Sequence, residues 1–121
     1  MTGNVRPRHA AFQPDELLAE QADGTRPYLE FLRRESLSAG LYVLPAGADD
    51  FQAPHTEDEV YVVLEGDAVL RADEHDTRVG PGSILFVAAT VPHRFHSIAS
   101  DLKVLVFFAP AEYSNTRAPA G

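Results

Sequence analysis

The 121-residue chain contains no cysteine and no tryptophan, and its basic side chains are few. Without cysteine it can form neither a disulfide nor a thiolate metal site. Ten Lys and Arg residues against 18 Asp and Glu residues give a formal net charge of -8, which argues against nucleic-acid and anionic-membrane partners. No apolar run approaches the about 20 residues that cross a bilayer, and residues 1–9 lack the apolar segment of a secretory signal. We therefore expect a cytoplasmic protein with no membrane or nucleic-acid partner.

Motifs for phosphate-bearing cofactors are also missing. The sequence has no Walker-type phosphate loop, no dinucleotide fingerprint and no nucleophile elbow. We accordingly assign no residue to an organic cofactor.

What is present is a globular composition, 45% hydrophobic and 23% charged, on a chain long enough for one domain. We divide it into an N-terminal arm with a short helix at 14–21 (residues 1–27), a strand-rich domain (28–110) and a mobile C-terminal tail (111–121). Proline at the first helical position and acids in the first turn suit the helix, and Gly24 suits its end.

The strand-rich domain contains short segments of β-branched, aromatic and leucine residues, separated by turn-forming residues. The turns include those expected at 65–67, 73–74 and 100–101. This spacing predicts an antiparallel sandwich or barrel. The predicted strands are 28–35, 37–44, 60–65, 68–72, 83–87, 94–98 and 102–108.

Segments 60–64 and 105–108 are apolar at consecutive positions, so both faces of these strands need cover. One face lines the interior. The other requires a second sheet, the N-terminal segment or another subunit, and we expect a homodimer.

Three residues carry metal-ligand chemistry: His55, Glu59 and His93. On one continuous strand the first two would sit about 13 Å apart, too far to share an ion. They meet either one turn apart on a helix or, as the polar residues 56–58 favour, across a tight connection. Two imidazoles and a carboxylate hold a divalent metal on adjacent corners and leave other corners for substrate.

Each residue also has an ordinary structural interpretation. Glu59 could pair with Arg94 at a strand edge, His55 could be a solvated loop residue, and His93 could donate a hydrogen bond to a backbone carbonyl. The other histidines are expected to lie outside any site, because they fall in the arm, in a turn or on the opposite strand face. These are His9, His75 and His96.

The same residues resemble the two motifs of the cupin family. Gly47, His55, Glu59 and Gly66 match the first motif with every spacing kept, and Gly82 and His93 match the ends of the second. The resemblance covers roughly residues 36 to 108. The departures are Ala53 in place of the usual first histidine, Ala88 and Thr90 in place of the internal proline and glycine, and Ser97 in place of the trailing asparagine.

The resemblance implies an all-β fold, an antiparallel, jelly-roll-like barrel (double-stranded β-helix), to which the residue pattern at 14–21 adds a short N-terminal helix. It also implies a divalent ion (iron, manganese, zinc, nickel or copper), normally held by three histidines and the glutamate. With Ala53 in one position, His55, Glu59 and His93 remain as ligands, which suffices for a catalytic zinc or a non-haem iron. We expect Gln52 to face away, because it neighbours Ala53 along a strand.

The pocket walls follow from strand parity. Tyr61, Val63 and Phe95 should share the cavity with the ligands, and Ile84, Phe86, Tyr42 and Leu44 should add to it. Tyr61 is singled out, since its hydroxyl could orient a substrate oxygen. We therefore assign Glu59, His93 and Tyr61 to catalysis.

Three functions remain open. The first is a metal-dependent enzyme acting on a small organic molecule, with oxidoreductase chemistry such as that of a dioxygenase favoured by the two-histidine, one-carboxylate set. The second is a metal-free acid/base isomerase or epimerase, with His55 or His93 as base and Glu59 tuning it. The third is a non-catalytic module that binds or senses a small molecule.

Overall fold

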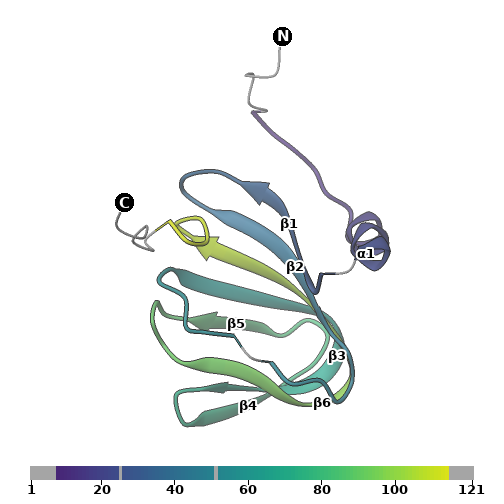
Figure 1. The fold of residues 1–121 in the computed structure, drawn as a ribbon, viewed down its shortest axis with the longest axis vertical. Coiled ribbons are helices and arrows are strands. Elements are labelled where there is room, and N and C mark those ends of the chain that lie inside the picture. The colour runs from purple at the N-terminus through teal and green to yellow at the C-terminus, as the bar shows by residue number, and fades with distance from the viewer. Residues whose placement is uncertain (1–7, 25, 51, 115–121) are drawn as a thin grey trace.

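The computed structural model describes residues 8–24, 26–50 and 52–114, and within them it shows one helix and six strands (Figure 1). The elements are α1 (Pro14–Asp23), β1 (Tyr28–Arg33), β2 (Ser38–Leu44), β3 (Asp58–Ala72), β4 (His75–Val79), β5 (Ile84–Val87) and β6 (His93–Ala109). The all-β fold with one short helix is confirmed. No helix in the described ranges is long and apolar enough to span a membrane.

Helix α1 lies where the sequence predicts it and runs two residues further. Pro14 occupies its first turn, where the missing N–H is no loss, and Asp15 and Glu16 lie at the positive end of its dipole. Leu17 is its one buried residue, so the helix packs lightly beside β1 and β2.

The strands form one antiparallel sheet in the order β1-β2-β6-β3-β4, and β5 pairs with β3. Strands β3 and β6 pair along almost their whole lengths, from Asp58 opposite Ala109 to Ala72 opposite His93. Because both strands bend at mid-length, the sheet folds over on itself into the barrel shape that Figure 1 shows.

The bend lies where the sequence analysis expected turns, and those two turn predictions are wrong. Residues 65–67 and 100–101 are inside β3 and β6, and the register between them shifts around Gly66, which has a φ of 105°. A glycine at positive φ therefore makes a bulge here and not a chain reversal. The bend returns β3 to the end of the barrel at which it began, so residues at both of its ends can meet.

Strand β4 was not predicted, because His75, Asp76, Thr77 and Arg78 are polar and exposed. The strand forms because it pairs with β3, although its own residues are not typical of a half-buried strand. His75 is exposed at the first position of β4, immediately after the predicted turn at 73–74.

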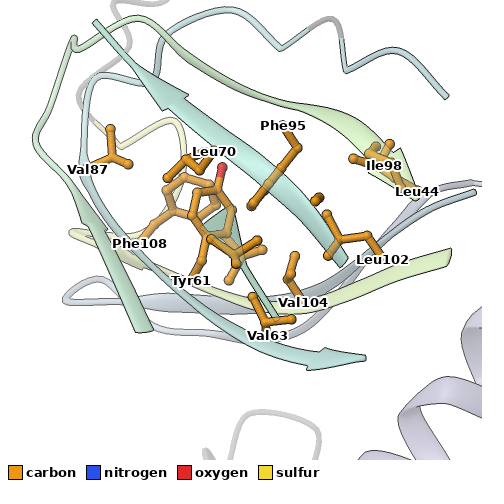
Figure 2. Packing of buried hydrophobic residues seen from close by; sticks show 13 residues of the cluster. Leu44, Tyr61, Val63, Leu70, Val87, Phe95, Ile98, Leu102, Val104 and Phe108 are labelled. Carbon is orange, nitrogen blue, oxygen red and sulfur yellow. The ribbon is translucent and has the colours of Figure 1, made fainter. Parts of the chain in front are cut away.

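The core fills the barrel interior, as Figure 2 shows. Its largest fully buried apolar side chains include Tyr61, Phe95 and Phe108, each at most 2% exposed. Tyr61 and Phe95 meet edge to face with ring centroids 4.9 Å apart. The cluster comprises Leu44, Tyr61, Val63, Ala68, Leu70, Val79, Val87, Phe95, Ile98, Leu102, Val104, Val106 and Phe108.

Two interior predictions are wrong. Ile84 is 72% exposed and Phe86 is 64% exposed, so both lie on the outside of β5. Strand parity explains the reversal: Val87 faces the core, and residues 84 and 86 of this four-residue strand carry the more exposed side chains of its alternating burial pattern.

The chain just after β6 is folded against the barrel, although we expected the tail to begin at residue 111. Ala111 is 1% exposed and Glu112 is 7% exposed. The part of the tail prediction that concerns residues 115–121 lies outside the described residues.

Candidate metal centre

Glu59 is the second residue of β3 and its side chain points into the barrel. Alternation along the strand places Glu59, Tyr61 and Val63 on the inner face, and each is at most 1% exposed. A carboxylate with this burial needs a compensating partner. The partners that the structure provides are histidines and not Arg94, which is exposed.

His93 enters from the first position of β6, opposite the last residue of β3. Its Nδ1–H donates a hydrogen bond to the carbonyl oxygen of Val91, at an N···O distance of 2.9 Å. That bond leaves Nε2 as the nitrogen that faces inward. Nε2 lies 3.0 Å from Glu59 Oε1 and 3.1 Å from the Tyr61 hydroxyl.

His55 lies in the segment that precedes β3, and Thr56 and Glu57 form the tight connection that the sequence predicts. Its carbonyl oxygen accepts a 2.7 Å hydrogen bond from the amide of Thr90, and its ring packs on Phe108 at 4.7 Å. Its Nδ1 points to Glu59 Oε1 at 3.6 Å. Residues 38 positions apart in the sequence are thus joined through Glu59.

The donor atoms fit a metal ion. His55, Glu59 and His93 each offer one ligand atom, and these atoms all lie within 4.8 Å of one another. Ligands about 2.0–2.2 Å from one ion are separated from each other by roughly 3.0–3.5 Å, so the contacts of 3.0 and 3.6 Å are close to the required spacing.

Unsatisfied polar atoms point the same way. Within the described part of the chain, His55 Nδ1 and both oxygens of Glu59 are buried without a hydrogen-bond partner. The 3.0 Å approach of His93 Nε2 to Glu59 is therefore a charge contact with poor hydrogen-bond geometry. Leaving such groups unpaired is unfavourable by about 1–3 kcal/mol each, and a cation between them would satisfy them together.

Both imidazoles have a raised pKa. Burial alone would lower the pKa of His55, but the hydrogen bond with Glu112 and the charge of Glu59 outweigh it. Burial also opposes the change at His93, where the contact with Glu59 and the bond to the Val91 carbonyl raise the pKa. Burial and the charge of Glu59 hold the pKa of Tyr61 far above its usual value, so its hydroxyl stays protonated.

These shifts predict how the stability of the metal-free protein depends on pH. A pKa that is higher in the folded state adds stability below the unfolded value of about 6.5, and this stability is lost as the pH rises through the folded value. Urea unfolding should therefore give a free energy of unfolding that falls from about pH 6 upwards. The dependence of the unfolding free energy on pH should be weaker in a His55→Gln, His93→Gln double variant. A wild-type unfolding free energy that rises with pH above about pH 6 would contradict the raised pKa of the two histidines.

A pocket of about 860 Å³ adjoins the site, and its lining includes His55 and Glu59 but not His93. Ala53 lines it, so the position of the missing family histidine opens into this space. The lining side chains come from α1, β1, β2, the segment before β3, β3 itself, β6 and the chain after β6. They include Gln21, Tyr28, Glu30, Tyr42, Gln52, Ala53, His55, Glu59, Phe108, Glu112 and Tyr113.

Gln52 faces this pocket, which corrects the prediction that it faces away. Its Nε2 donates to Asp50 Oδ2 at 2.9 Å and lies 3.4 Å from the Tyr61 hydroxyl. The parity argument failed because the segment 52–55 is not a strand. Among the other expected wall residues, Tyr42 lines the pocket. The rest do not line it and belong to the core cluster: Leu44, Tyr61, Val63 and Phe95.

Three buried acids that hold the site together were missed. Asp50 accepts hydrogen bonds from Tyr42, Gln52 and the amide of Phe95, and Glu57 accepts one from the amide of Tyr113. The third acid, Glu112, lies 3.0 Å from His55 Nε2. No spacing in the sequence marks these residues, because each sits in a connecting segment.

The comparisons with known proteins agree with this geometry. The Cupin_2 model, described as Cupin domain, matches residues 40–108, more than half of the chain. The chain belongs to the cupin family. It is 49% identical over 102 residues to the uncharacterized protein SCO3923 of Streptomyces coelicolor, a match that covers 84% of this chain and 97% of that protein.

Several solved structures resemble this cupin along most of the barrel. The crystal structure of DMSP lyase DddQ from Ruegeria pomeroyi is 27% identical with a TM-score of 0.62, and the match covers 72% of this chain but 43% of the lyase. An RmlC-like cupin from Methanocaldococcus jannaschii is 18% identical with a TM-score of 0.67, covering 88% of this chain and 94% of its own. Salicylate 1,2-dioxygenase from Pseudoaminobacter salicylatoxidans is 16% identical with a TM-score of 0.64, and the match covers 78% of this chain and 30% of the dioxygenase. The last two likenesses establish the fold alone.

Proposed function

We propose that this cupin binds one divalent metal ion through His55, Glu59 and His93 and uses it to transform a small organic molecule in the adjoining pocket. The observation that carries the proposal is the convergence of His55, Glu59 and His93. Three of their candidate ligand atoms, His55 Nδ1 and both carboxylate oxygens of Glu59, are buried with no hydrogen-bond partner among the described residues. A two-histidine, one-carboxylate set with open positions favours oxidoreductase chemistry of the dioxygenase kind. When bound, such an ion would supply Lewis-acid or redox chemistry to the substrate.

The side chains around the ligands supply orientation and a proton. The Val91 carbonyl fixes the His93 ring, and Phe108 supports the ring of His55. The Tyr61 hydroxyl, 3.1 Å from His93 Nε2, loses this acceptor once Nε2 is a ligand. Tyr61, which is fully buried and does not line the pocket, would then donate to Glu59 or to a substrate oxygen that reaches the ligands, and this is the catalytic role that the sequence predicts for it.

Metal content is the direct test of this function. Protein purified without chelator should carry about one ion per chain by mass spectrometry, and turnover of any substrate should stop when the ion is removed and return when it is restored. Turnover that persists in metal-free protein would overturn the proposal.

A metal-free isomerase or epimerase is the second candidate, because each histidine pairs with a carboxylate: His55 with Glu112 and His93 with Glu59. Such pairs suit acid/base catalysis. A nucleotide-sugar substrate is disfavoured, since Arg26 is the one permanently cationic side chain among the described residues that line the pocket. Metal-free turnover lost in a Glu59→Gln variant would select this candidate, and ligand binding without turnover would indicate a sensing module.

We further propose that two copies of the chain pair through the outer face of β5 and its neighbours. Ile84 and Phe86 are exposed, and they lie opposite Val62 and Val60 of β3. On the other side of β3, Val60 lies opposite Phe107 of β6. An apolar patch of this kind on a small domain gains stability when it is covered. A cytoplasmic location stays a prediction from the sequence.

Replacement of Phe86 by glutamate should disrupt this pairing. Light scattering after gel filtration should give twice the chain mass of 13.2 kDa for the wild type and the single mass for Phe86→Glu. Thr77→Glu, a change at another exposed strand position, on β4, is the matched control and should stay dimeric. A wild type that runs as a monomer, or a dimeric Phe86→Glu variant, would refute the interface.

A further inference from the structure

The chain after β6 lines the pocket beside the proposed metal centre through Glu112 and Tyr113, and it is tied down at four points. The amide of Ala111 donates to the Glu35 carbonyl, the amide of Glu112 to Ser38 Oγ at 2.8 Å, and the amide of Tyr113 to Glu57 Oε1 at 3.0 Å. The fourth tie runs from Arg33 to the carbonyl oxygen of Glu112 at 2.8 Å. We refer to residues 111–113 as the strap.

The ties fix where the Glu112 side chain points. Both its amide and its carbonyl group are bonded to the barrel, from β2 and β1 respectively, and Glu112 is 7% exposed. Its carboxylate is directed into the pocket, where Oε2 lies 3.0 Å from Nε2 of His55. A carboxylate held by two backbone anchors is pre-organised, so little entropy is lost when it holds a partner.

We infer that Glu112 is a positioning residue for the metal centre: it accepts the Nε2–H proton of His55 in a hydrogen bond and thereby presents Nδ1 as the ligand nitrogen. The inference rests on the proposed metal-binding function. In a neutral imidazole one nitrogen carries the proton and the other the lone pair, so the partner of Nε2 decides the state of Nδ1. Nδ1 is the nitrogen that faces Glu59, at 3.6 Å, and it has no hydrogen-bond partner among the described residues.

Glu112 does not itself belong to the ligand set. The group whose donor atoms all lie within 4.8 Å of one another contains His55, Glu59 and His93 but not Glu112. In this assignment each histidine turns one ring nitrogen toward Glu59 and donates the N–H of the other to an oxygen. The acceptor is the Val91 carbonyl for His93 and the Glu112 carboxylate for His55. Carboxylate partners of this kind raise the basicity of a ligand imidazole.

Because of the strap, the site depends on a segment outside the matched cupin region, which ends at residue 108. Ala53 leaves one family ligand absent, so the remaining imidazoles carry more of the binding. A fixed ring at His55 then matters more than it would in a site with four protein ligands.

The test compares Glu112→Ala and Glu112→Gln with the wild type by titration of metal-free protein with Co²⁺ or Zn²⁺. Glu112→Ala should weaken binding by about 10–100-fold. Glu112→Gln keeps an oxygen acceptor for Nε2–H and should recover most of the affinity. Glu20→Gln removes the same charge from the lining of the same pocket without a contact to His55, and should bind as the wild type does.

Nitrogen NMR of metal-free protein gives a readout that does not need the ion. At a pH where His55 is neutral, the wild type should carry its proton on Nε2, and Glu112→Ala should show a mixture of tautomers. Unchanged affinity or an unchanged tautomer in Glu112→Ala would overturn the inference. Equal loss in both Glu112 variants, with an altered Co²⁺ absorption spectrum, would make Glu112 a direct ligand and would also overturn it.

The two proposals fail in different ways. If the wild type binds neither ion, the metal-dependent function fails, while the NMR comparison still reports whether Glu112 sets the tautomer of His55. If the wild type binds an ion and the Glu112 variants bind it equally well, the function stands and the positioning role fails.

Discussion

Replacement of His93 by alanine is expected to remove the metal ion from the protein. The side chain supplies one of three ligands, and loss of a supporting residue outside the ligand set already weakens metal sites by about 10–100-fold, so loss of a ligand should weaken this one by roughly 100-fold or more. The change also leaves the buried Glu59 with His55 as its remaining charged partner at 3.6 Å. Metal content after gel filtration, with circular dichroism as a check on folding, measures the effect.

His96→Ala is the matched control. His96 follows His93 by three residues on β6, but its ring points to the outside and its Nε2 contacts Asp76 at 3.0 Å. This variant should retain about one ion per chain. Should His93→Ala remain folded and hold as much metal as His96→Ala, the ion does not lie at the proposed centre.

Replacement of Gly66 by alanine should destabilise the barrel strongly. Gly66 has a φ of 105°, and a methyl group there would lie 2.5 Å from the carbonyl oxygen of Asp101 and 2.7 Å from Cα of Leu102. Because both are backbone atoms of β6, no side-chain rotation can relieve the clash. We expect a loss of about 3 kcal/mol or more in the free energy of unfolding, and a melting temperature lower by about 10 °C or more.

Gly47→Ala separates this packing effect from backbone strain. Gly47 also has a positive φ, 75°, but no atom lies within 4 Å of the position a methyl group would take. The change should lower stability by only about 1 kcal/mol. Equal unfolding free energies for the two alanine variants would show that the close contact of β3 with β6 at Gly66 does not contribute to stability.

The sequence predicts the barrel and its ligands because those features depend on local pattern. Inward-facing apolar residues alternate along β3 and β6, and His55, Glu59 and His93 keep the spacing of the family motifs. Glycines carry less certain information: Gly66 was predicted to end a strand, yet it bends one that continues to Ala72. Whether a positive φ gives a turn or a bulge depends on the neighbouring strand, which the local sequence does not encode.

The parts of the site that could not be predicted lie in connecting segments. Asp50, Glu57 and Glu112 are acids in an acidic chain, and burial rather than residue type distinguishes them. Gln52 turns toward the pocket because its segment is irregular, so strand parity does not apply. A polar residue of a loop acquires its partner only when distant segments come together, as Glu112 and His55 do across 57 positions.

X-ray absorption spectroscopy on the protein as purified, without chelator, tests the central claim most directly, because it reports the ligands of the ion itself. The proposed centre predicts about one ion per chain, with two imidazole nitrogens and one carboxylate oxygen at about 2.0–2.2 Å, and lighter ligands such as water at the open positions. A protein with no ion, or an ion whose spectrum contains no imidazole scattering, would contradict it.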